Sequence, residues 1–114
     1  MSITKMTPKQ IYRVRSIEKE YGIDDLKIYA YIDGGSLVVV GEIIAEKLLD
    51  TFKLVCSIYD QEGDMIESIK NEPYGSGVVT SEIYPRAFFD RYPFLFRTYL
   101  GNKVKIGKIR VTPE

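Results

Sequence analysis

The chain has 114 residues, 45% of them hydrophobic and 28% charged, with a formal net charge of zero at pH 7; this composition is typical of one globular domain and excludes a disordered segment. It contains no histidine and a single cysteine, which excludes Ser-His and Cys-His nucleophile pairs, most transition-metal sites and an internal disulfide. No run reaches the roughly 18 apolar residues of a membrane span, so we expect a single domain, residues 1–114, without a transmembrane segment.

The N-terminal extension, residues 1–22, allows two interpretations. Thr7 and Gln10 fit the capping box of a helix, and Gly22 fits its stop. The segment is basic at its start and acidic at its end, however, which is the wrong order for a helix dipole. Because a strand beginning near Tyr12 is the alternative, the sequence predicts either a short helix or a strand here.

The first hairpin follows this extension. Residues 26–32 alternate between apolar and polar side chains, and residues 37–45 form a longer apolar strand. Between them, Asp33-Gly34-Gly35-Ser36 supplies glycines that accept positive φ. The stretch 37–44 is apolar on both faces, so we expect it to be central or covered; at a sheet edge it would predict a dimer formed by edge strands.

A second hairpin joins residues 52–59 to residues 65–69 through the turn residues 60–64. Its first strand alternates, and the single cysteine, Cys56, falls on its apolar face, which predicts a buried, inert thiol. Residues 70–77 then form a loop, and a weaker strand is expected over residues 78–84.

The last hairpin permits a prediction of register. Pairing Leu100 with Val104 through a three-residue loop keeps the apolar residues of both strands on one face. The apolar residues then change from even positions, Val104 and Ile106, to odd positions, Ile109 and Val111. This change requires one extra residue in the strand, which predicts a β-bulge near Gly107. The outer face of this hairpin would carry Arg97, Tyr99, Lys105, Lys108 and Arg110.

About seven short strands with turns roughly every 8–12 residues predict an all-β fold. We expect an antiparallel, immunoglobulin-like β-sandwich over residues 26–112, preceded by the N-terminal helix or strand.

The sequence motifs that could indicate a metal or phosphate site are incomplete. The acidic stretch 60–64 has its glycine three residues after Asp60, whereas a calcium loop of the EF-hand type needs it five residues after the first aspartate; it is therefore interpreted as a turn. Gly75-Ser76-Gly77 lacks the lysine of a phosphate-binding loop. We expect no catalytic residue, no metal site and no cofactor.

The segment 84–99 is the strongest candidate for binding, because it interleaves arginines with half of the chain's aromatic residues. Tyrosine and arginine are enriched at protein-interface hot spots. The phenylalanines, from Phe88 to Phe96, are assigned to the core or to one end of the sandwich. The candidate contact residues are Arg91, Tyr92, Arg97, Tyr99 and Lys105.

The charges are segregated along the chain. Residues 1–17 carry four bases and no acid, residues 18–90 carry 15 acids and six bases, and residues 91–114 carry six bases and one acid. A basic, aromatic C-terminal section resembles the footprint of single-strand binders. The acidic middle section would repel phosphate unless it lies on another face, so nucleic acid is not the expected partner.

The residues Val40-Gly41-Glu42-Ile43 and Phe52 to Asp64, which include Cys56-Ser57-Ile58-Tyr59-Asp60, resemble the FxLYD-type immunoglobulin-like domain. That family combines a V-x-G-x-V strand, a strand ending in F-x-L-Y-D and a D-x-x-G turn. The likeness covers residues 37–70, and the first position of the second motif departs from it. The resemblance implies a β-sandwich with a binding or spacer role and no catalytic residues.

These features favour a non-enzymatic β-sandwich module that acts through protein–protein contact. One alternative is a small immunity or inhibitor protein whose acidic middle section covers the active site of a partner enzyme. A second is a carbohydrate-binding or glycan-processing domain that uses paired carboxylates. The N-terminus has no signal-peptide core, so a cytoplasmic location is expected, and a leader preceding the given residues would place the domain outside the cytoplasm.

Overall fold

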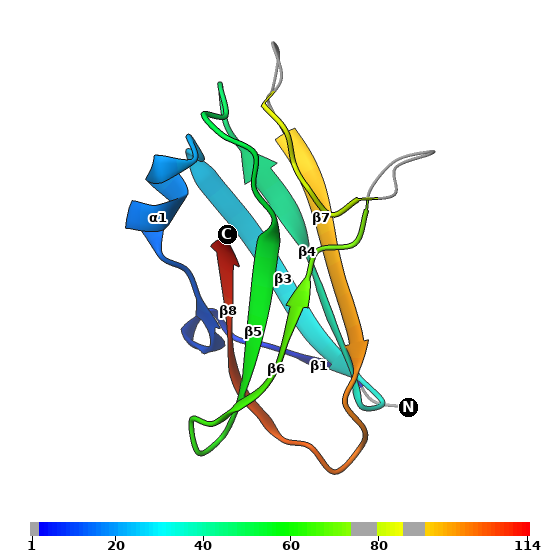
Figure 1. Ribbon diagram of the computed structural model, residues 1–114. Helices are drawn as coiled ribbons and strands as arrows, with labels where there is room; N and C mark the ends of the chain where they lie inside the picture. The colour runs from blue at the N-terminus through cyan, green and yellow to red at the C-terminus, as the bar shows by residue number, and fades with distance from the viewer. Residues whose placement is uncertain (1–2, 74–79, 86–90) are drawn as a thin grey trace.

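The computed structural model describes residues 3–73, 80–85 and 91–114 (Figure 1). Two four-stranded sheets face each other: sheet A has the order β1-β3-β4-β7 and sheet B the order β2-β8-β5-β6. The elements are β1 (Ile3–Lys5), η1 (Pro8–Gln10), β2 (Ile11–Tyr12), α1 (Arg15–Glu20), β3 (Asp25–Asp33), β4 (Ser36–Ile44), β5 (Leu54–Asp60), β6 (Met65–Lys70), β7 (Arg91–Tyr99) and β8 (Ile106–Pro113). The predicted all-β sandwich is confirmed.

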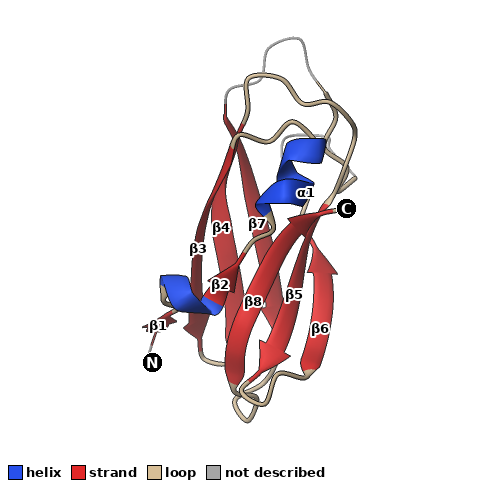
Figure 2. Cartoon of the chain, turned by 90° about the vertical axis from the view of Figure 1, so that its left-hand side faces the viewer, coloured by secondary structure: helices blue, strands red, loops and turns tan. Residues whose placement is uncertain are grey.

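Figure 2 shows the two layers from the side, with β3, β4 and β7 in one and β8, β5 and β6 in the other. All described strand pairs are antiparallel except β2 and β8, which pair in parallel. Two strands, β1 and β2, come from the N-terminal extension and were not predicted separately. They add one short edge strand to each sheet.

The N-terminal extension contains both of the structures that the sequence allowed. The side chain of Gln10 accepts a hydrogen bond from the backbone N–H of Thr7 at 2.9 Å, and the helix that this opens is the short η1. The strand at Tyr12 follows, then α1, and Gly22 has a φ of 83° just after the helix. Of the helices that the structure describes, the longest has six residues, far too few to cross a membrane.

The first two hairpins are confirmed. Gly34 and Gly35, with φ values of 56° and 88°, form a two-residue turn that pairs Asp33 with Ser36. Strand β4 lies between β3 and β7, so the strand that is apolar on both faces is central, as expected. The condition for the predicted edge-strand dimer is therefore not met at β4.

The inner faces of the two sheets form one core. Sheet A contributes alternate residues such as Leu37, Val39 and Phe96, and sheet B contributes Leu54 and Cys56 among others, each no more than 1% exposed. Side chains from the connecting segments, among them Ile23, Leu48 and Ile83, are buried in the same core. This single core holds the outer faces of both sheets in place.

The predicted last hairpin is wrong. Strand β7 pairs with β4 in sheet A, whereas β8 pairs with β5 in sheet B, so the connection between them crosses from one sheet to the other. Val104 lies in this connection and is 37% exposed instead of buried. The predicted bulge is confirmed, because Tyr59 pairs with Lys108 and Asp60 with Ile106, leaving Gly107 as the extra residue. The predicted alternation of buried residues within β7 and β8 was correct, but the burial of Val104 and the assigned pairing partner were not.

The weaker strand expected at 78–84 lies partly outside the described residues. In its described part, Ile83 forms an isolated bridge with Phe52, and no regular strand is present. Part of the predicted loop at 70–77 and the predicted end plug at Phe88 and Phe89 also lie outside the described residues. The confirmed core phenylalanines are Phe94 and Phe96.

Candidate binding faces

The five candidate contact residues do not share one surface. Arg91, Arg97 and Tyr99 point outward from β7 on sheet A and are exposed. Tyr92 is only 8% exposed and belongs to the core, which corrects its assignment to an exposed patch. It has the same strand parity as the core phenylalanines, so it points inward with them. Lys105 is exposed in the connection between β7 and β8.

The outer side of sheet A, named face A here, carries an apolar band across its three long strands. The register aligns Tyr29 of β3 with Val40 of β4 and Leu95 of β7, and the next row aligns Tyr31 with Val38. Tyr29 is 55% exposed at this surface. Sequence reasoning missed these residues, although the apolar residues on both sides of β4 were the signal that could have found them.

Ion pairs lie at the margin of face A. Arg91 contacts Glu42 at 2.7 Å, and Arg97 donates two hydrogen bonds of 3.1 Å to the carboxylate of Glu72. This hydrogen bonding raises the pKa of Arg97. A shallow depression of about 360 Å³ lies between the Arg91–Glu42 pair and Tyr29. Arg91 and Arg97 are thus paired with carboxylates at the edge of face A, and the middle of the face is apolar, whereas the exposed Lys27 forms no ion pair among the described residues.

The outer side of sheet B, named face B, has a different chemistry. Along β5 and β8, buried residues alternate with residues that point outward, and the outward residues form this face. They are Tyr12, Val55, Ser57, Tyr59, Met65, Ser68, Lys70, Lys108, Arg110 and Thr112. Three of these are cations and none is an acid. The predicted basic outer face is therefore divided: Lys108 and Arg110 lie on face B, whereas Arg97 and Tyr99 lie on face A.

The cations of face B are not neutralised. None of Lys70, Lys108 and Arg110 forms an ion pair within residues 3–73, 80–85 and 91–114. Instead, the Nζ atom of Lys108 lies over two aromatic rings, 5.0 Å from the centroid of Tyr12 and 5.2 Å from that of Tyr59. Such cation–π contacts orient the ammonium group without cancelling its charge.

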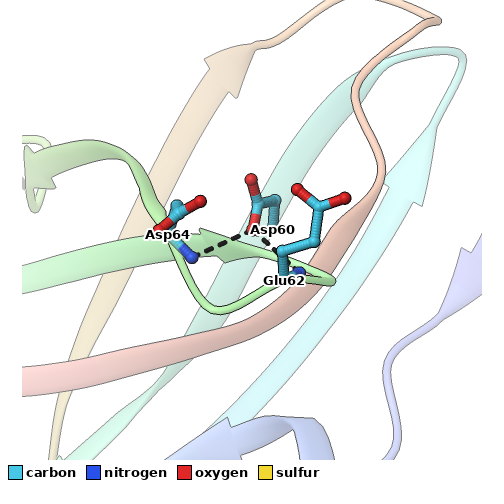
Figure 3. Close-up of side chains that lie close together, drawn as sticks. All are labelled: Asp60, Glu62 and Asp64. Atoms are coloured by element: carbon cyan, nitrogen blue, oxygen red, sulfur yellow. Dashed lines mark hydrogen bonds between the residues drawn. The ribbon is translucent and has the colours of Figure 1, made fainter.

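The acidic turn 60–64 follows β5 and adjoins Tyr12 and Lys108 of face B. Figure 3 shows the side chains of Asp60, Glu62 and Asp64 in this turn. One oxygen of Asp60 accepts hydrogen bonds from the backbone N–H groups of Glu62 and Asp64, both at 2.9 Å. Carboxylate oxygens of these three residues lie within 4.8 Å of one another. Gly63, with a φ of 90°, completes the reversal. The geometry agrees with the interpretation as a turn, in which an aspartate side chain holds the backbone.

A partly buried cluster joins the N-terminal extension to sheet A. Arg13 contacts Glu18 of α1 at 2.5 Å and Asp25 of β3 at 2.7 Å, and Glu18 is only 2% exposed. The Arg13 guanidinium, donating a hydrogen bond to Asp25, lowers the pKa of that carboxyl. The cluster links α1 to the sheet, with one guanidinium shared by two carboxylates.

The cysteine lies in the core between the two faces. Burial raises the pKa of Cys56 to about 12, so at neutral pH it is a thiol without nucleophilic character. This agrees with the prediction of a buried, inert side chain.

No family model, curated protein or solved structure matches the chain at a significant level. The candidate sites therefore rest on the geometry of faces A and B.

Proposed function

We propose that the chain is a non-enzymatic binding module that contacts a partner protein through face A. The observation that carries this proposal is the apolar band formed by Tyr29, Val40 and Leu95 on the exposed side of a sheet whose other side already faces the core. Contiguous exposed apolar surface on a small domain marks an interaction site more often than scattered apolar residues do.

The arrangement of face A supports this role. An apolar centre with a charged margin is the usual anatomy of a protein interface. Tyr29 and Tyr99, 55% and 67% exposed, supply the large side chains that serve as anchors at such interfaces. The ion pairs of Arg91 and Arg97 keep their charges out of the centre and leave them available to orient a partner.

The resemblance of residues 37–70 to FxLYD-type immunoglobulin-like domains supports the same class of function, since that family implies a binding or spacer role. The residues carrying the resemblance belong to β4, β5 and the turn after β5. They contribute more to the sandwich than to face A. The proposal therefore rests on the surface and takes only the fold class from the resemblance.

A photo-crosslinking amino acid placed at position 29 tests the proposal. In a nuclease-treated extract of the source cells, we expect a specific protein adduct from position 29 and none from position 12, an exposed tyrosine on face B that serves as the matched control. Adding Val40→Lys to the position-29 probe should lower the adduct yield roughly tenfold, because it places a charge in the apolar centre. Equal adducts from both positions, or no effect of Val40→Lys, would contradict the proposal.

A further inference from the structure

We propose that face B binds single-stranded nucleic acid without sequence preference, a function independent of the contact assigned to face A. Three observations carry the inference: unneutralised cations on a sheet surface, tyrosine rings beside them, and small side chains in the middle of the sheet. Sheet surfaces of this kind bind single strands by attracting the phosphates and stacking the bases.

The positions of the cations suit a chain of phosphates. Lys108 and Arg110 are two residues apart on β8, so their Cα atoms are separated by about 7 Å along the strand. Lys70 lies one further row along, on β6, two strands away from β8. The three cations thus extend from β8 to β6 on the outer side of the sheet, and none forms an ion pair with an acid of the described residues.

The tyrosines offer surfaces for bases. Tyr12 is 49% exposed on β2, and Tyr59 is half-buried on β5, with Lys108 between them. A base stacking on Tyr12 would displace the Lys108 ammonium from that ring and leave it free to contact the adjoining phosphate. In the next row, Ser57 and Ser68 carry small side chains, and Ser57 is only 5% exposed between its larger neighbours. An extended strand can lie across this row.

The acidic middle section was the argument against nucleic acid, but three of its carboxylates beside the sheets are engaged away from Lys70, Lys108 and Arg110. Glu42 and Glu72 pair with arginines on face A, and Glu67 turns toward sheet A, where it accepts a hydrogen bond from Thr98. The turn 60–64 is the acidic neighbour of face B, next to Lys108. A bound strand would therefore run away from this turn, from Lys108 toward Lys70.

Fluorescence anisotropy of a labelled oligothymidylate of about 12 nucleotides tests the inference. With three phosphate contacts, we expect the logarithm of the binding constant to fall against the logarithm of salt concentration with a slope of about −2, or roughly 20-fold between about 50 and about 200 mM salt. Arg110→Ala should weaken binding severalfold and reduce this slope by about 0.7. Lys27→Ala, which removes an exposed cation from face A, is the matched control and should leave binding unchanged.

Tyr12 separates stacking from general attraction of anions. Tyr12→Ala should weaken binding roughly fivefold or more, and Tyr12→Phe, which keeps the ring, should restore it. Polyglutamate, a protein-like polyanion, should compete poorly. Failure to bind the oligonucleotide, equal loss with Lys27→Ala, or polyglutamate binding that equals oligonucleotide binding would each overturn the inference. None of these outcomes bears on crosslinking from face A.

Discussion

Faces A and B lie on opposite sides of the same core and differ in how many of the cations of their long strands form ion pairs. On face A, Arg91 and Arg97 are paired with carboxylates at the margin, around an apolar centre. On face B, Lys70, Lys108 and Arg110 have no acidic partner among the described residues. The zero net charge of the chain therefore gives no guide to its surfaces, because the acids that balance the cations of face B lie mostly in α1, the turns and the connecting segments.

The strand order produces this difference. Strands β7 and β8 are successive in sequence, and both are basic on their outer side, yet they belong to different sheets. On face A, the basic residues of β7 meet Glu42 on β4 and Glu72, which follows β6 and donates its backbone N–H to the carbonyl of Leu95. In sheet B, the neighbours of β8 present Tyr12, Ser57 and Tyr59 instead. The neighbouring segments, rather than the strand's own sequence, decide whether its cations form ion pairs.

The largest effect is expected from the core that both faces share. Phe96 is fully buried against sheet B, so Phe96→Ala should lower the free energy of unfolding by about 3–5 kcal/mol. Because one core supports both sheets, tyrosine fluorescence and far-ultraviolet circular dichroism should report one coincident transition in urea. Two separate transitions, one for each sheet, would contradict a shared core.

A smaller effect should distinguish the two faces directly. Val40 and Val55 are half-buried outward valines at central strands, the first on face A and the second on face B. Val40→Lys should shorten retention on a hydrophobic-interaction column far more than Val55→Lys, because Val40 has Tyr29 and Leu95 as neighbours. Equal shifts for both variants would show that face A is not the more apolar surface.

The smallest effect is expected where the N-terminal extension meets sheet A. Arg13 lowers the pKa of Asp25 below its usual value of 3.8, so the ionised carboxylate stabilises the fold above that pH and the stabilisation is lost as pH falls below it. Since the side chain is 44% exposed, Asp25→Asn should cost only about 0.5 kcal/mol at neutral pH. Urea titrations should show this difference shrinking toward zero near pH 2. A difference that persists undiminished in acid would assign the effect to packing.

The sequence predicted the sandwich and its first two hairpins because alternation and turn residues are local properties. Asp33 to Ser36 specifies a two-residue turn, and the alternation around Cys56 specifies a buried face. It also predicted the bulge at Gly107, since the parity of buried residues changes there whichever strand is the neighbour. Parity says nothing about the pairing partner, which is why β8 was assigned to β7 instead of β5.

The candidate sites were less predictable for the same reason. Tyr92 was chosen by residue type, although its parity with Phe94 places it in the core. Val40 was interpreted as part of a covered strand, because apolar residues on both faces of a strand do not reveal which face stays open to solvent. The grouping of Tyr12 with Lys108 depends on the parallel pairing of β2 with β8, which links residues almost a hundred positions apart.

The central claim is that the two faces have separate binding chemistry, and a nuclear magnetic resonance titration tests it most directly. In the ¹⁵N-labelled protein, addition of oligothymidylate should shift the backbone amide signals of Tyr12, Ser57 and Arg110 on face B. The amide signals of Tyr29 and Val40 on face A should stay in place throughout the titration. Shifts centred on face A, or spread equally over both faces, would contradict the account.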